Sequence, residues 1–227
     1  MRGISLKYNI IYLLFTYTLL FTVSLSATET TDPDVLAAEA LLERVLPGYG
    51  EYFIFKKISK EADKNVFIIE SRDNSIIISG DNGVSMASGL NWYLKYYCDS
   101  DISLFGTQIN VAIPLPEVSK PIKQVNSQKY RYMLNYCSFG YTMAWWDWNQ
   151  WEKLIDWMAL NGINLPLAVT GQEAVWQNVA KRIGIDDLSD FFTGPPYLPF
   201  SWMGNLDGWG GPLSENWIQE HEELQKR

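Results

Sequence analysis

The sequence predicts an α/β protein in two parts, a small α/β domain followed by strand–helix units of a parallel sheet. In the first half, β-rich runs lie between two segments whose apolar residues have helical spacing. From residue 130 onward, buried strands and helices alternate, and this alternation is typical of a parallel sheet. A chain of 227 residues has room for one small domain plus part of a second.

Residues 1–26 are typical of a secretory signal peptide. Arg2 and Lys7 precede an apolar run from about Ile10 to Val23, and small residues follow the run. We therefore expect cleavage near Ala27, entry into the secretory pathway and no membrane contact after cleavage. The alternative is an uncleaved membrane anchor, which is disfavoured because a membrane span needs about 20 apolar residues.

Residues 27–120 are predicted to form the small N-terminal α/β domain. A first helix is ended by Pro47 and Gly48, and a second helix opens at Gly83. Residues 121–129 are expected to be a linker to the second domain. Strands are expected at residues 51–59, 65–73, 74–82 and 108–115.

Residues 130–227 are predicted to begin the second domain. Capping-box spacing marks the start of two helices, at Asp147–Gln150 and at Thr170–Glu173. Pro166 falls inside the second predicted strand, and because proline cannot donate to a ladder we expect it at a bulge or gap. Buried strands are expected at residues 130–137 and 163–169.

Tryptophan is concentrated in residues 135–176. In parallel α/β arrays the loops that leave the carboxyl ends of the strands carry the chemistry. Aromatic rings beside amides and carboxylates are typical of a sugar site, because rings cover the apolar faces of a pyranose. For Trp145 and Trp146, packing and ligand contact both stay open. Simple packing of a helix on the sheet is expected for Trp148, Trp151 and Trp157.

Three further residues are candidates for a role in a site. Asn135, at a strand end, can both donate to and accept from a sugar hydroxyl, but such residues also bind backbone, and both interpretations remain open. For Glu173 we favour helix capping over catalysis. For Cys137 we favour a pocket wall or a buried thiol over a nucleophile, because the single histidine, His221, forms no triad pattern with it.

Charge and cysteine content exclude several classes of protein. The net charge of −8 and pI near 4.7 argue against nucleic acid or an anionic membrane surface as partner, since both select for clustered lysine and arginine. Two cysteines, Cys98 and Cys137, are too few for a disulfide scaffold. No cofactor and no metal are expected.

Seven strings in the chain resemble the lysosomal α-N-acetylglucosaminidase family, glycoside hydrolase family 89. The resemblance covers nearly all of the chain after residue 27. It implies a small α/β domain, a (β/α)₈ TIM-type barrel and a C-terminal helical domain, so this chain would hold the first units of an incomplete barrel. The strings are ALLERVLPG, GVSMASGLNWYLKYYC, RYMLNYC, WWDWNQWEKLIDWMALNGINLPLA, GQEAVWQ, FFTGP and MGNLDGWGGPL.

The resemblance implies an exo-acting retaining hydrolase that releases terminal α-linked N-acetylglucosamine from heparan sulfate-type chains, in the lysosome or after secretion. The expected partner is a glycan that ends in this sugar. By resemblance, Asn135, Cys137 and Met203 are substrate-binding positions. Phe200 stands where the family usually has a pocket tryptophan, with Trp202 two residues further on.

The resemblance assigns no catalytic residue to this chain. Retaining hydrolysis needs two carboxylates about 5 Å apart, and the family's two glutamates come from later barrel strands. The chain is therefore expected to be an N-terminal fragment that is inactive alone. The alternative is a stand-alone glycan-binding module or an inactive paralogue. A reading frame that continues beyond Arg227 into two further glutamates would separate the two hypotheses.

Overall fold

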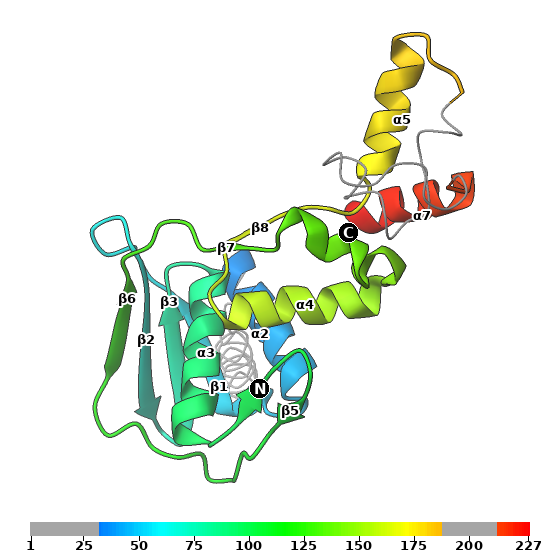
Figure 1. The fold of residues 1–227 in the computed structure, drawn as a ribbon. Coiled ribbons are helices and arrows are strands. Elements are labelled where there is room, and N and C mark those ends of the chain that lie inside the picture. The colour runs from blue at the N-terminus through cyan, green and yellow to red at the C-terminus, as the bar shows by residue number, and fades with distance from the viewer. Residues whose placement is uncertain (1–31, 188–212) are drawn as a thin grey trace, which may run out of the picture. The chain divides into compact units, whose positions relative to one another are not determined.

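The computed structural model describes residues 32–187 and 213–227, and the first domain is built on a mixed four-stranded sheet (Figure 1). The strand β1 runs parallel to β3, whereas β2 is antiparallel to both of its neighbours. Asp73 and Asn74, predicted as a turn, have positive φ angles between β2 and β3. The strand order is β1 (Phe53–Lys57), β3 (Ser75–Gly80), β2 (Asn65–Arg72), β6 (Ile122–Asn126).

The core of this domain lies between one face of the sheet and two helices, α2 (Pro33–Val45) and α3 (Gly83–Tyr97). Phe53 pairs with Ile76 and Phe55 with Ile78, so alternate residues of β1 and β3 point to the same face. Gly89 lets α3 approach the sheet closely, since a Cβ atom there would lie 2.8 Å from Ile78 Cγ2. A short 3₁₀ helix, η1 (Gly50–Tyr52), leads into β1.

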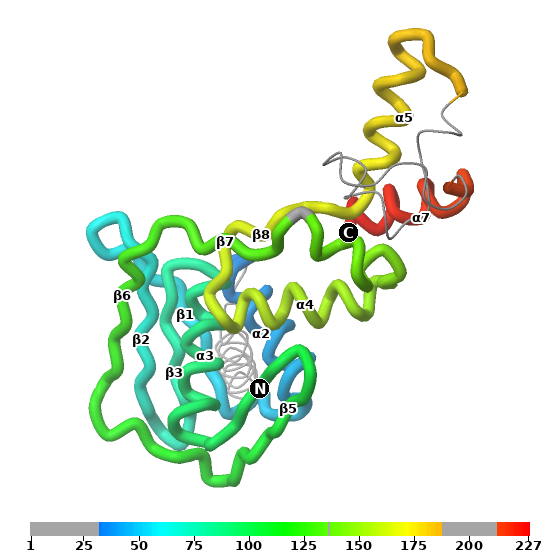
Figure 2. The backbone as a smooth tube through the Cα atoms, in the orientation of Figure 1, coloured from blue at the N-terminus to red at the C-terminus, as the bar shows by residue number. Residues whose placement is uncertain are grey.

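Two expectations for this region are wrong. Residues 121–129, expected to be a linker, contain β6, which pairs with the otherwise unpaired edge of β2 (Figure 2). Residues 108–115 do not form the expected last strand. The strand in this region, β5 (Thr107–Gln108), has two residues, which pair with β4 (Asp101–Ile102). Apolar residues of the 108–115 segment still pack on the core, so their pattern reflects burial of an irregular segment.

The second part of the chain begins with the predicted strand–helix–strand unit. The strands β7 (Tyr132–Met133) and β8 (Leu165–Pro166) are parallel neighbours, and α4 (Trp148–Leu160) connects them. Both strands are shorter than predicted, and Pro166 stands at the end of the ladder opposite Met133. The fold class is thus α/β as predicted, and among the described residues the parallel pair forms an open sheet, as an incomplete barrel requires.

Side-chain bonds attach α4 to the first domain. Arg44 on α2 donates two hydrogen bonds of 2.7 Å to the buried carboxylate of Asp156. Asn91 on α3 donates from Nδ2 to the carbonyl of Leu160, at 3.1 Å. The predicted capping box at the start of α4 is confirmed, because Asp147 and Gln150 bond to each other's backbone N–H.

The last described helices are α5 (Gln172–Arg182) and α7 (Glu215–Gln225), which pack together through Ala174 and Ile218. None of the helices in residues 32–187 and 213–227 is long and apolar enough to cross a membrane. The predicted signal peptide lies outside the described residues.

Candidate functional site

Polar side chains lie at the carboxyl ends of the two parallel strands. Asn135 comes two residues after β7, and Thr170 comes four residues after β8. Because the strands are parallel neighbours, both segments leave the same edge of the sheet. This is the edge where the sequence predicts a site.

Asn135 is exposed and is fixed by its neighbours. Its Oδ1 accepts hydrogen bonds from the backbone N–H of Ser138, at 2.9 Å, and from the Ser138 hydroxyl, at 3.0 Å. It thereby caps the 3₁₀ helix η2 (Tyr136–Gly140). The amide nitrogen Nδ2 makes no hydrogen bond to a described residue, so the side chain presents a donor in a fixed orientation.

Cys137 lies within η2 and is half-buried, and Phe139, two residues later in η2, is fully buried. Of the four predicted substrate-binding residues, the structure therefore places Asn135 and Cys137 on the same turn after β7. The other two, Phe200 and Met203, lie outside the described residues.

The sequence favours helix capping over catalysis for Glu173, yet the environment of this carboxyl is unusual. Its side chain is fully buried, and neither carboxylate oxygen makes a hydrogen bond to a described residue. The same holds for the hydroxyl of Thr170, which is also buried. Burial raises the pKa of Glu173 to about 7, and the backbone N–H of Glu173 itself acts weakly in the opposite direction.

The predicted capping box at Thr170–Glu173 is wrong. The residue that caps α5 is Gly171, whose φ of 80° is left-handed. Glu173 is therefore the second residue of the helix. In a capping box the side chain that accepts from the N-cap backbone N–H belongs to the third residue. Gly171 also lies against α7, where a Cβ atom would come 3.0 Å from the carbonyl oxygen of His221.

The tryptophans of this region have two kinds of environment. Trp148, Trp151 and Trp157 pack on the core beneath α4, as expected. Trp146 also packs there, edge-to-face with Trp151 at 5.3 Å between ring centroids. Trp145, in the 3₁₀ helix η3 (Met143–Trp145), is 62% exposed. Packing thus accounts for Trp146 but not for Trp145.

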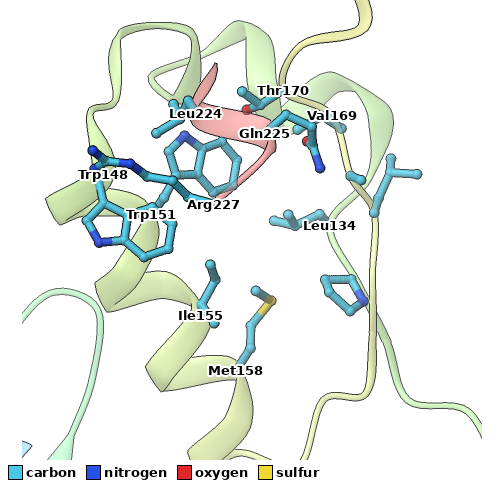
Figure 3. Close-up of a pocket in the computed structure, with 13 residues that line it drawn as sticks. Leu134, Trp148, Trp151, Ile155, Met158, Val169, Thr170, Leu224, Gln225 and Arg227 are labelled. Atoms are coloured by element: carbon cyan, nitrogen blue, oxygen red, sulfur yellow. The ribbon is translucent and has the colours of Figure 1, made fainter. Parts of the chain in front are cut away.

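A cavity of about 210 Å³ lies between α4, the segment after β8 and the end of α7 (Figure 3). Its walls are mostly apolar, and two of its buried polar atoms, Trp151 Nε1 and Thr170 Oγ1, have no hydrogen-bond partner among the described residues. Asn135 and Cys137 do not line it. The structure therefore brings these two residues to the predicted edge but not into this cavity.

His221 is held in a structural role. One ring nitrogen lies 2.9 Å from the carbonyl of Trp217, the other lies 3.2 Å from that of Ala144, and the ring stacks on Trp217. It is thus committed to the contact between α7 and η3 rather than to activating the thiol of Cys137. The described residues contain no group of three potential metal ligands.

A small α/β domain followed by parallel strand–helix units, with polar and aromatic residues at the strand ends, fits the first units of a (β/α)₈-barrel enzyme. Comparison with known proteins agrees. The family model described as the α-N-acetylglucosaminidase TIM-barrel domain matches residues 131–227, and the companion model for the N-terminal domain matches residues 36–117. The chain belongs to the α-N-acetylglucosaminidase family, glycoside hydrolase family 89.

Two kinds of relative support this assignment. Human α-N-acetylglucosaminidase is 43% identical over 152 residues, which are 66% of this chain and 20% of the human protein. A family 89 glycoside hydrolase from Clostridium perfringens, solved with 2-acetamido-1,2-dideoxynojirmycin, is 34% identical with a TM-score of 0.81, over 85% of this chain and 22% of that one. The same values describe a complex with its substrate GlcNAc-α-1,4-galactose. The chain thus spans about a fifth of the length of these relatives.

Proposed function

We propose that this chain supplies part of the sugar pocket of an exo-acting retaining hydrolase, which releases terminal α-linked N-acetylglucosamine from heparan sulfate-type chains. The observation that carries the proposal is the turn after β7, where Asn135 and Cys137 stand at the carboxyl end of a parallel strand. The Clostridium relative is described with a substrate that contains GlcNAc, which supports the choice of sugar.

The geometry of Asn135 suits recognition of a sugar oxygen. Ser138 engages its Oδ1, so the side chain offers Nδ2 as a donor without further ordering. A donor fixed in advance loses little conformational entropy on binding. Cys137, Phe200 and Met203 are proposed as further pocket positions from the family resemblance.

We assign neither of the two catalytic carboxylates to the described residues. A retaining mechanism needs an ionised nucleophile beside an acid/base group. Glu173 is the one carboxyl at these strand ends among the described residues, and a raised pKa favours its neutral form. A neutral carboxyl is a poor nucleophile, and an acid/base carboxyl acts only beside a second carboxylate, which the described strand ends do not supply. The pair is proposed to come from other parts of the whole protein.

The proposed location is the secretory pathway, with delivery to lysosomes or secretion. The charged and apolar pattern of residues 1–26 supports this proposal. An N-terminal sequence of the product recovered from secreting cells tests it.

Binding of 2-acetamido-1,2-dideoxynojirmycin to the purified chain tests the proposed function. Ligand-observed NMR should detect binding that weakens about tenfold in Asn135→Ala, the loss expected for one hydrogen bond of about 1.4 kcal/mol. Asn178→Ala, at an exposed position of α5, is the matched control and should bind like the parent. Equal binding by both variants would remove Asn135 from the pocket.

Turnover is the second measurement. The chain should not hydrolyse a chromogenic α-N-acetylglucosaminide, because binding without the carboxylate pair gives little acceleration. Turnover that is lost in Glu173→Gln would instead place catalysis on this chain. A reading frame that ends at Arg227 in the sequenced transcript would favour the stand-alone binding module.

A further inference from the structure

A second, polar cleft of about 310 Å³ lies where the first domain meets the β7–α4–β8 unit. None of the residues at the carboxyl ends of β7 and β8 lines it. Its walls come from β2, β6, α3, the segment between β6 and β7, and the turn after α4. The polar and aromatic residues that line it include Asn65, Trp92, Gln124, Ser127 and Arg131.

Arg131 is the cation of this cleft, and its guanidinium is held in place. Its Nε donates to the carbonyl of Gly162, and Nη1 donates to Asn65 Oδ1, at 3.1 Å, and to the carbonyl of Gln128, at 2.7 Å. Its second terminal nitrogen, Nη2, makes no hydrogen bond to a described residue. No carboxylate among residues 32–187 and 213–227 forms an ion pair with it.

The carboxylate of Asp81, whose negative charge acts on Arg131, already accepts hydrogen bonds from other groups. Its carboxylate accepts hydrogen bonds from Asn65 Nδ2, the Val66 backbone N–H, Asn82 Nδ2 and the Ser85 hydroxyl, at 2.6 to 2.9 Å. Asn65 therefore stands between the two charges and bonds to both. Burial lowers the pKa of Arg131, and the charge of Asp81 acts in the opposite direction.

Partial burial of a charge costs solvation free energy, and an ion of opposite charge beside it offsets that cost. Arginine is also the usual ligand of anionic groups. A half-buried guanidinium, oriented by three acceptors and with one nitrogen uncommitted, is therefore suited to an anion that enters the cleft.

The rest of the lining suits a sugar ring. The Gln124 amide and the Ser127 hydroxyl make no hydrogen bond to a described residue, so both can bind ring hydroxyls. Trp92 is half-buried and is held by Tyr96, with ring centroids 4.7 Å apart. The volume falls at the lower end of the range for small-molecule sites, about 300–1,000 Å³.

We propose that this cleft binds a pyranose that carries a negative charge, with the anion at Arg131 Nη2 and the ring hydroxyls at Gln124 and Ser127. A uronate and a sulfated amino sugar present the same chemistry to the guanidinium. The proposal does not rest on the proposed function, because the need for an anion comes from Arg131 and the cleft lies apart from Asn135 and Cys137.

Titration of the whole ¹⁵N-labelled chain, observed at the Nε–H signal of Arg131, tests the proposal. The Arg131→Lys variant identifies the signal by its loss. The probes are methyl glucuronide, a sulfated glucosamine, neutral N-acetylglucosamine and inorganic sulfate. A saturable shift is expected with at least one anionic sugar, and little or none with N-acetylglucosamine or with sulfate at the same concentration.

Two matched charge substitutions show where the sugar binds. Gln124→Glu places a negative charge in the cleft and should weaken binding of the anionic sugar about tenfold. Gln108→Glu makes the same change at an exposed position of β5 outside the cleft and should have no effect. Asn135→Ala should leave this binding unchanged, which separates failure here from failure of the proposed function.

The outcomes divide clearly. Binding of the uronate alone, of the sulfated sugar alone or of both supports the cleft and identifies the source of the charge. The proposal is overturned if neither anionic sugar shifts the signal, or if N-acetylglucosamine or inorganic sulfate binds as tightly. Equal effects of Gln124→Glu and Gln108→Glu would overturn it as well.

Discussion

Replacing Glu173 by glutamine should make the stability of the protein less dependent on pH. The carboxyl is fully buried at the start of α5 and has no hydrogen-bond partner among the described residues. Burial raises its pKa from 4.5 to about 7. The unfolded chain exposes the group to water. Between pH 4.5 and about 7 the folded protein therefore holds a proton that the unfolded chain has released.

The size of the effect follows from the shift. One pKa unit corresponds to about 1.4 kcal/mol, so the difference between 4.5 and about 7 amounts to about 3 kcal/mol. Because the folded pKa is the higher one, this stability is fully present below the unfolded pKa and is lost as the pH rises through about 7. Glutamine has the shape of the neutral acid and cannot ionise, so the variant should lack the loss.

Urea unfolding, followed by tryptophan fluorescence at steps between about pH 4.5 and about pH 8, measures the difference between the two proteins. As the pH rises over this range, the free energy of unfolding of Glu173→Gln should increase by about 3 kcal/mol relative to that of the parent. Glu39→Gln, at an exposed position of α2, is the control and should show no such trend. A difference between parent and Glu173→Gln that stays constant with pH would refute the reasoning, because it would mean an ionised, partnered carboxylate.

Three further predictions concern folding and processing. Arg44→Ala should lower the free energy of unfolding in urea by about 2 kcal/mol, since it leaves the buried carboxylate of Asp156 unpaired; an unchanged midpoint would contradict this. Gly89→Ala should lower it by about 1–3 kcal/mol, because the new Cβ would overlap Ile78 in the core, and a gain in stability would show that α3 can shift. Mass spectrometry of the secreted product should find an N-terminus near Ala27, whereas a retained Met1 with membrane association would favour the anchor.

Local signals in the sequence predicted most elements of the first domain and the start of α4. The turn at Asp73–Asn74 and the capping box at Asp147–Gln150 each depend on residues within a few positions of one another. The strand β6 was missed because its pairing is not local. Residues 122–126 become a strand only when the edge of β2, more than fifty residues earlier, is present to pair with them.

In the candidate site, too, features set by local residues could be predicted and features set by distant contacts could not. The position of Asn135 at a strand end could be predicted, because the apolar run before it indicates a strand. The burial of Glu173 could not, because capping-box spacing fits two registers of the helix start. Gly171 decides between them by adopting a left-handed conformation against α7, a contact with residues about fifty positions away. A glycine inside the capping motif was the one local signal for this register.

The first domain also determines where the strand ends lie, and Arg131 is central to that effect. Its side chain bonds to the turn that ends α4 and to Asn65 on β2, while Arg44 holds the same helix at Asp156. The carboxyl-terminal half of helix α4 is thus attached to the first domain. The strands β7 and β8 precede and follow this helix in the chain. Any ligand that binds the Arg131 guanidinium adds a contact at the junction between the first domain and the two strands. Occupancy of the polar cleft should therefore also protect the backbone amide of Leu165, which donates to the Arg131 carbonyl at 3.2 Å, from hydrogen exchange.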